Sequence, residues 1–564
     1  MPTPIVPEAP LTAAEPAIAS RHKDRLIAAS LFLGTFLVFL AFPYPGSRKW
    51  DAWMAATVMA RWSECAWNEI FFFAHPLGML ITRAFYMVLP FEDAMLVVTW
   101  REVTFAALNA ALVYLLFSQI LRSRWGGVLV SLAFTLPLEH WLLATRGEEK
   151  DMVLFFLLLV MFPFFHLRGW IHLQLFHHIR RSRLAALLGG LLALSVAVHL
   201  QNGLLVPFLL LATVLSRDFR ANRRRDLREL AILYGVALIS AAAFFLPVAW
   251  WAIGVRDAEG FARWLLEYHL SGQNLDTNYV FAQRILQAYT AFREYLFGWH
   301  LPAPGAVECV TALWLLILVL ARAWCVHRDL CMASAVFLGL HALHFFNYRQ
   351  EPEAWAGASI AGLTLAALAG WRRDLPVRRQ PGLALWVALV SVLGVAIVGT
   401  YRKGFADLAP LYARNAASYP ARYGALEKRF QAHLLEAQIA LHVDLTVEHE
   451  AIILVESRHL VNAFRVYTDR MPVVTRYLDR AEEYFHQSNV ALTVLSRHFY
   501  TPANSSRALR DQALAGRPLY FVARSQRPSD RVIRLFGDRW STAAGLSVYD
   551  WQLLRWGMPR GTAP

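Results

Sequence analysis

Four acidic residues of this sequence stand beside the ends of apolar segments, where an ionisable group is costly and therefore informative. They are Asp51, Asp151, Glu351 and Glu353. A carboxylate that loses part of its hydration can be tuned by a neighbouring arginine or metal ion, which suits general-base chemistry or cation binding. For any one of the four, a solvated loop acid without a chemical role is the commoner interpretation. Their shared position favours the functional one.

The elements that hold these acids are apolar segments long enough to cross a membrane. The chain has 564 residues, of which 57% are hydrophobic and 17% charged, and its mean hydropathy is +0.38. A soluble domain is only about 45–50% apolar. About 20 apolar residues span the hydrocarbon core as a helix, which satisfies its backbone groups internally. We predict about eleven spans, near residues 26–43, 94–120, 126–144, 151–168, 184–199, 203–216, 230–252, 304–324, 329–346, 354–371 and 383–400.

Arginine-rich loops mark one face of this predicted bundle. If the N-terminus is cytoplasmic, every strongly basic loop lies on the inner side, as the positive-inside rule describes. The largest of these loops holds Arg217, Arg220, Arg223, Arg224, Arg225 and Arg228. The four acids then share the outer face, and an odd number of spans places the chain after Tyr401 outside as well. Because these loops account for the net charge of +14, nucleic acid is not an expected partner.

Composition divides the chain into three parts. Residues 1–24 are rich in Pro and Ala and predict a disordered cytoplasmic tail, residues 25–400 a transmembrane domain, and residues 401–564 a soluble outer α/β domain. The buried strands predicted in the last part are Ala451–Val455, Val490–Val494 and Leu519–Ala523, with a helix over Ala503–Leu514. The four cysteines form no CxxC pair, so neither a disulfide framework nor a structural zinc site is predicted.

Three short segments resemble motifs of one enzyme superfamily. Residues 49–53 (Lys-Trp-Asp-Ala-Trp) and 75–78 (His-Pro-Leu-Gly) resemble the first outer loop of GT-C glycosyltransferases. Residues 145–151, which include Arg146 and Asp151, resemble the second acidic motif of that superfamily. The likeness covers roughly residues 26–400, and its nearest types are protein O-mannosyltransferases and the aminoarabinose transferases of lipid A modification. It implies a GT-C-like transmembrane fold followed by a soluble domain outside the membrane.

The resemblance also implies a reaction. The donor would be a sugar on a polyprenyl phosphate, transferred with inversion to an acceptor that the sequence does not identify. Asp51 would be the general base and Asp151 the second catalytic acid. The leaving phosphate needs positive charge, and the guanidinium fork binds phosphate through two hydrogen bonds. The candidate arginines are Arg101, Arg146, Arg256 and Arg349. For Arg101, a structural salt bridge to an acid on a neighbouring helix is an equal alternative.

Other residues of the outer loops are further site candidates. They are His75, Glu148, Glu149, His269, Glu351 and Glu353. Several family members have a second acid directly after the first, but this chain has Ala52 there, so a metal bound by a vicinal pair is not implied. Magnesium or manganese is compatible with the acids near Glu149 but is not required by their spacing. The segment His199–Gly203 either lines a donor cavity or is a polar turn.

Three other functions remain open from the sequence. A transporter or flippase of lipid-linked sugars would explain the charges at the ends of the spans, but not a large outer domain. A membrane glycan polymerase or ligase would use the same donor class. A scaffold with a partner-binding C-terminal domain is the third. The short loops and the content of Ala and Arg favour a multi-pass protein of a bacterial inner membrane, in contact with membrane lipid.

Overall fold

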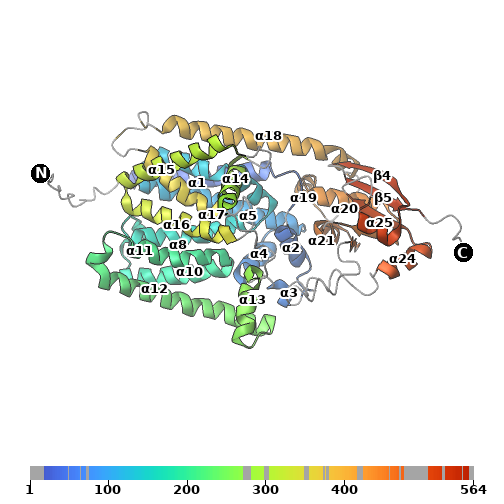
Figure 1. The fold of residues 1–564 in the computed structure, drawn as a ribbon, viewed down its shortest axis with the longest axis horizontal. Helices are drawn as coiled ribbons and strands as arrows, with labels where there is room; N and C mark the ends of the chain where they lie inside the picture. Colours follow the sequence, from blue (N-terminus) through green and yellow to red (C-terminus); the bar gives the residue numbers. More distant parts are fainter. Residues whose placement is uncertain are drawn as a thin grey trace.

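The protein is an elongated molecule with a helical part at one end and a small sheet at the other (Figure 1). The computed structural model describes residues 18–48, 50–63, 65, 67–71, 75–270, 281–297, 304–347, 355–371, 375, 380, 382–415, 423–456, 458–468, 470, 472–475, 506–523, 528–548 and 551–557. Within these residues the helices come first and the sheet follows, because apolar runs dominate the sequence up to residue 400 and short strands appear only after residue 450.

All eleven predicted spans coincide with helices. These are α1 (Ile18–Ala41), α5 (Ala94–Leu121), α6 and α7 (Arg124–Thr135, Leu138–Arg146), α8 (Lys150–Leu167), α10 (Arg181–Val198), η1 and α11 (Leu200–Leu204, Leu205–Val214), α12 and η2 (Phe219–Pro247, Val248–Ile253), α15 (Ala306–Val326), α16 (Arg328–Asn347), α17 (Trp355–Gly370) and α18 (Leu383–Asn415). In the described part, seven helices are long and apolar enough to cross a membrane, and α6 with α7, bent by 65°, would make an eighth. Helices α11 and α17 are shorter. The predicted polytopic helical membrane protein is confirmed.

Burial separates the inner helices from those that face outward. Most of α5 and α8 is buried at the centre of the helical part, whereas α15 exposes large apolar side chains such as Val307 and Trp314. A helix that is apolar all round needs either protein or lipid on every side. The exposed face of α15 is therefore the kind of surface that lipid covers. Glycine allows the closest approach inside the bundle: a Cβ at Gly189 of α10 would collide with the Leu233 carbonyl of α12.

The loop between α1 and α5 contains three helices, α2 (Trp50–Ala60), α3 (Trp67–Ile70) and α4 (Pro76–Val88). The sequence predicts that this amphipathic loop lies in the membrane interface, and that placement stays a prediction. Within α2, residues 52–59 are all buried, because α5 and α21 (Arg458–Tyr467) pack against this helix. Ala52 therefore faces a protein core, where a second acid would be an uncompensated buried charge.

The C-terminal part is a small α/β unit, as predicted (Figure 1). Its strands are β1 (Ile452–Val455), β2 (Val473–Val474), β3 (Leu519–Ala523), β4 (Trp540–Val548) and β5 (Trp551–Trp556), in the order β2-β1-β3-β5-β4. Strand β1 is parallel to β2 and β3, and β5 is antiparallel to β3 and β4. The helices are α19 (Ala425–Gln431), α20 (Leu435–Thr446), α21, α24 (Ser506–Leu514) and α25 (Asp530–Phe536). Two predicted strands are confirmed, and Val490–Val494 lies outside the described residues.

One hydrophobic core joins this unit to the helical part. It contains side chains of α2 and the start of α5 together with side chains of α18 to α21 and of β1, β3 and β5. Helix α18 runs without a break through the predicted boundary at residues 400–401. Asp93, directly before α5, accepts hydrogen bonds from Gln431 Nε2 at 2.7 Å and from the Tyr467 hydroxyl at 3.2 Å. The C-terminal unit is thus fastened to the end of the central helix.

Candidate active site

The turn between α7 and α8 is the centre of the candidate site. Gly147 ends α7 with a φ of +78°, a left-handed conformation that favours glycine, and α8 begins three residues later. This tight turn holds Arg146, Glu148, Glu149 and Asp151, which the sequence singled out, within six residues of chain. The backbone then points these side chains in different directions, so that some enter the protein and others face an opening.

Arg101 and Glu102 of α5 form a buried clasp on the inner side of the turn. Arg101 donates from Nε to Glu102 Oε1 at 2.8 Å, from Nη2 to the Gly147 carbonyl at 3.3 Å, and from Nη1 to the Thr82 hydroxyl. Glu102 Oε2 accepts the backbone N–H of Asp151 at 2.9 Å and of the next residue at 3.2 Å. Both side chains are fully buried. The clasp therefore fastens α4, α5 and the start of α8 together.

Asp151 points into the protein, next to this clasp. Its Oδ1 lies 3.1 Å from His140 Nε2 and 3.3 Å from Asn109 Nδ2, and Asn109 also donates to the Asp151 carbonyl at 2.8 Å. Asp151 and His140 are almost completely buried. Its Oδ2 has no hydrogen-bond partner among the described residues. Asp151 belongs to the interior support of the turn, and it contacts α5 and α7 rather than an opening.

Glu149 lies on the opposite, open side of the turn. Its Oε2 is 3.7 Å from Nδ1 of His75, the residue before α4, and these side chains are 14% and 17% exposed. The His75 ring also lies against His199, with ring centroids 4.0 Å apart. Burial opposes ionisation of Glu149, but His75 and the positive charge of Arg101 hold its pKa below the usual value. The open side thus presents a carboxylate and two imidazoles.

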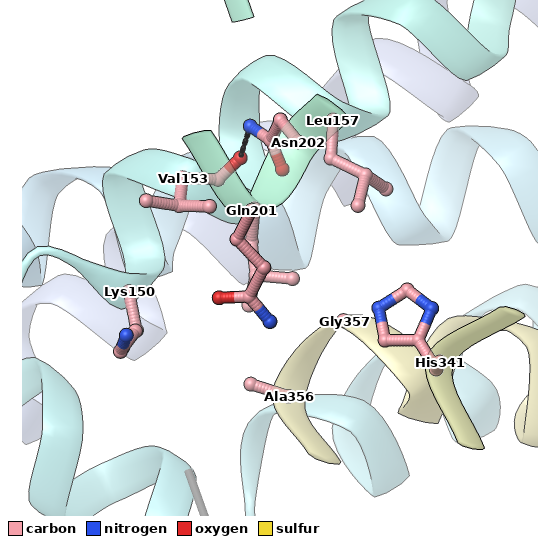
Figure 2. Close-up of a pocket in the computed structure, with 9 residues that line it drawn as sticks. Lys150, Val153, Leu157, Gln201, Asn202, His341, Ala356 and Gly357 are labelled. Carbon is pink, nitrogen blue, oxygen red and sulfur yellow. Dashed lines mark hydrogen bonds between the residues drawn. The ribbon is translucent and has the colours of Figure 1, made fainter. Parts of the chain in front are cut away.

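A pocket lies at the start of α8, lined by the residue that follows Glu149 and by residues 201 and 202, which come shortly after His199 (Figure 2). Lys150 and Gln201 supply polar groups to it, and Val153, Leu154 and Leu157 of α8 form an apolar wall. Asn202 is fixed by a hydrogen bond from its Nδ2 to the Val153 carbonyl at 3.1 Å, and His341, Ala356 and Gly357 of α16 and α17 complete the lining. The predicted polar turn at residues 199–203 therefore does line a cavity. His341 was not among the predicted site residues, although an ionisable residue inside an apolar span is itself a signal.

A second group of cations lies near the segment between α1 and α2. The Arg146 guanidinium stacks over the Tyr44 ring at 4.4 Å. Arg48 is buried, donates from Nη1 to the Tyr44 carbonyl at 2.8 Å, and contributes its backbone N–H to the carboxylate of Glu436 on α20 at 3.2 Å. Ser47 donates to the same carboxylate. The C-terminal unit thereby holds the segment that leads into α2 and Asp51.

The other predicted site residues fall in three groups, according to how much of each the structure describes. Glu148 is buried beside Arg146, and Arg256 is exposed in the turn between η2 and α13 (Ala258–Leu270), where no ion pair joins it to another described residue. Asp51 starts α2 and His269 lies near the end of α13, but the positions of their side chains are outside the described part. Arg349, Glu351 and Glu353 are outside it entirely. Within the described residues, no group of three or more His, Cys, Asp or Glu could hold a metal ion.

Comparison with known proteins gives a fold but no sequence relative. No protein-family model and no curated protein sequence matches the chain. Its structure is similar to ArnT from Cupriavidus metallidurans bound to undecaprenyl phosphate, with a TM-score of 0.57, 12% identity, and coverage of 96% of this chain and 100% of that one. The apo state of ArnT gives 0.56 and 13% identity over the same shares.

A weaker likeness joins it to the oligosaccharyltransferase of Archaeoglobus fulgidus tethered with an acceptor peptide, at a TM-score of 0.46 and 12% identity over 91% of this chain and 71% of that one. ArnT is an aminoarabinose transferase, one of the types that the sequence motifs resemble. Its likeness extends over nearly the whole of both chains, including the C-terminal unit. The chain has the fold of the GT-C glycosyltransferases.

Proposed function

We propose that the protein is an inverting glycosyltransferase that moves a sugar from a polyprenyl-phosphate donor to an acceptor on the outer face of the membrane. One observation carries this: a pocket lined by Lys150 and by the apolar side chains of Val153, Leu154 and Leu157 lies at the start of α8, directly after the turn that holds Glu149. A polyprenyl phosphate likewise combines an apolar tail with an anionic phosphate group. The fold likeness to ArnT, described as bound to undecaprenyl phosphate, supports the donor class.

The described residues suggest how the donor is held. The apolar tail would lie against Val153, Leu154 and Leu157, with the phosphate near Lys150 at the mouth of the pocket. A lysine acts there as a point charge for phosphate. Arg146 is the second candidate cation, because its side chain is partly exposed and lies in the same turn. Arg101 would have a positioning role, since its guanidinium nitrogens already bind Glu102, Thr82 and Gly147.

The proposed chemical step begins at Asp51. Its carboxylate takes the proton of an acceptor hydroxyl, and the freed oxygen attacks the anomeric carbon of the donor sugar. The bond from that carbon to the phosphate oxygen breaks, its electron pair leaves with the lipid phosphate, and the anomeric configuration is inverted. Lys150 and Arg146 would stabilise the charge that develops on the leaving group. Asp151 would serve by supporting the turn that carries Glu149 and Lys150.

The test is transfer of labelled sugar from undecaprenyl phosphate, using a panel of donor sugars, by the full chain in proteoliposomes. Asp51→Asn should lower turnover by roughly 10²–10⁴-fold, because an amide cannot accept the proton. Asp257→Asn, which changes an exposed acid of another outer turn, is the matched control and should leave turnover unchanged. Unchanged transfer by Asp51→Asn would remove the assignment of the base.

A second measurement separates the enzyme from a transporter of the same donor. Lys150→Met should weaken binding of the donor lipid in either case, whereas Asp51→Asn should abolish transfer and spare binding only in an enzyme. Movement of the lipid-linked sugar across the bilayer, without transfer to any acceptor and insensitive to Asp51→Asn, would support the transporter instead.

A further inference from the structure

An unpaired row of arginines covers the start of helix α12, at the end of the helical part opposite the sheet (Figure 1). We call this set the arginine face. Its members are Arg180, Arg183, Arg217, Arg220, Arg223, Arg224 and Arg228. All seven are exposed, and none forms an ion pair with another residue of the described part. Exposed cations of this density repel one another, so they favour an anionic partner.

Ion pairs on the opposite, buried side of α12 fix the orientation of this helix. Arg168 Nη1 of the α8 end lies 3.4 Å from buried Asp226, and Arg181 of α10 pairs with Glu229 at 2.7 and 3.1 Å. Residues 226, 229 and 230 are buried while 223, 224, 227 and 228 are exposed, which is the periodicity of a helix with one covered side. The two acids are thus used to dock α12, and the remaining arginines point outward.

The level of the arginine face relative to the apolar surface identifies its partner. The apolar part of α12 begins at Leu230. The backbone is kinked at Asn222, and residues 223–229, between the kink and Leu230, extend about 10 Å beyond the apolar part. Large apolar side chains are exposed among the arginines: Leu227 is 46% exposed on the same stripe, Leu215 is 45% exposed just before it, and Leu175 is 80% exposed near Arg180. Charged groups interleaved with exposed leucines at the end of a span fit the headgroup layer of a bilayer.

We infer that the arginine face binds the phosphodiester headgroups of anionic phospholipids. The guanidinium group pairs with a phosphate through two hydrogen bonds, and the exposed leucines enter the acyl region beside them. An acidic protein partner would account for the exposed arginines but not for the large exposed leucines among them. This inference uses neither the candidate active site nor the proposed reaction, and it fails or holds independently of them.

The experiment compares binding of phosphatidylglycerol and phosphatidylcholine with identical acyl chains to the purified full chain in neutral detergent, by native mass spectrometry. The wild-type protein should prefer phosphatidylglycerol. Changing Arg220, Arg223, Arg224 and Arg228 to Gln should reduce that preference by roughly tenfold or more, since each cation near an anionic surface contributes about a fivefold effect at low salt. The same four changed to Lys should retain part of it, because charge remains while the fork is lost.

A matched control removes the same number of charges elsewhere. Arg507, Arg510, Arg534 and Arg539 are exposed in the C-terminal unit, and their change to Gln should leave the lipid preference intact. An equal loss in this control, or no preference in the wild-type chain, would overturn the proposal. So would displacement of the bound lipid by a soluble poly-glutamate peptide at equal charge. The double change Arg223→Gln with Arg228→Gln should show a smaller loss in the same direction.

Discussion

Two clusters on either side of the turn at residues 147–151 contain the same kinds of residue but have opposite surroundings. In the closed cluster, Arg101, Glu102 and Asp151 are at most 1% exposed. Glu102 accepts hydrogen bonds from the Arg101 side chain and from the Asp151 backbone N–H, which joins α5 to the start of α8. In the open cluster, His75 and Glu149 are partly exposed beside a pocket. A buried group that already has its partners supports structure, whereas an accessible group can meet a ligand. Residue type alone does not distinguish these roles.

The largest expected effect comes from breaking the closed cluster. Arg101→Gln should destabilise the protein by about 3–5 kcal/mol, because Glu102 would become an uncompensated buried charge. The measurement is thermal unfolding in detergent, with the folded fraction followed by circular dichroism. Replacing both partners, as Arg101→Met with Glu102→Met, should recover most of this stability, since no lone charge remains. A single variant as stable as wild type would show that the clasp is not a structural support.

Another buried acid, Asp93, should make the stability of the protein depend on pH. Burial raises the pKa of Asp93 to about 6, above about 3.9 for the unfolded chain. The folded protein therefore binds this proton more tightly than the unfolded one, so the contribution to stability is complete below about pH 4 and is lost as the pH rises through about 6. The difference amounts to about 3 kcal/mol. The unfolding temperature of Asp93→Asn should vary less over this range than that of wild type, and an equal slope would contradict the assignment.

The open cluster should respond in activity and not in stability. Glu149→Gln removes the carboxylate that faces His75, so the imidazole loses the charged partner that orients it in the open cluster. We expect turnover to fall by about ten- to hundredfold. The unfolding temperature should stay near that of wild type. A large loss of stability with little loss of turnover would place Glu149 in the structural class with Arg101.

The smallest effect is expected where a predicted site residue has no described ion-pair partner. Arg256 is exposed in the turn before α13, so Arg256→Gln should change stability by less than about 0.5 kcal/mol and leave donor-lipid affinity unchanged. Lys150→Met, at the pocket, should weaken that affinity about tenfold as one charge contact is lost. Titration of both variants with undecaprenyl phosphate measures the two affinities. Equal weakening by the two changes would move the phosphate site toward α13.

The C-terminal unit contains strands that the sequence pattern predicts and a hairpin that it does not. Its strands Ile452–Val455 and Leu519–Ala523 were predictable because each is a continuous apolar run between polar segments. The hairpin of β4 and β5 was not, since β4 consists mostly of small and polar residues and has no run of large apolar side chains. The boundary at residue 401 marked a change of composition. The shared core of α2, α5 and the C-terminal helices crosses it.

The sequence by itself determined which segments form apolar helices and where strands β1 and β3 lie, because apolar runs are local properties that need no partner. It also placed Arg146, Glu149 and Asp151 in one turn. Only the tertiary structure decided which of these faces the interior and which faces a pocket. That choice depends on Arg101, Thr82 and Asn109, which reach the turn from α4 and α5, on His140 of α7, and on the left-handed backbone at Gly147. Burial is a property of the packed chain, so residues of equal chemistry acquire different roles only after folding.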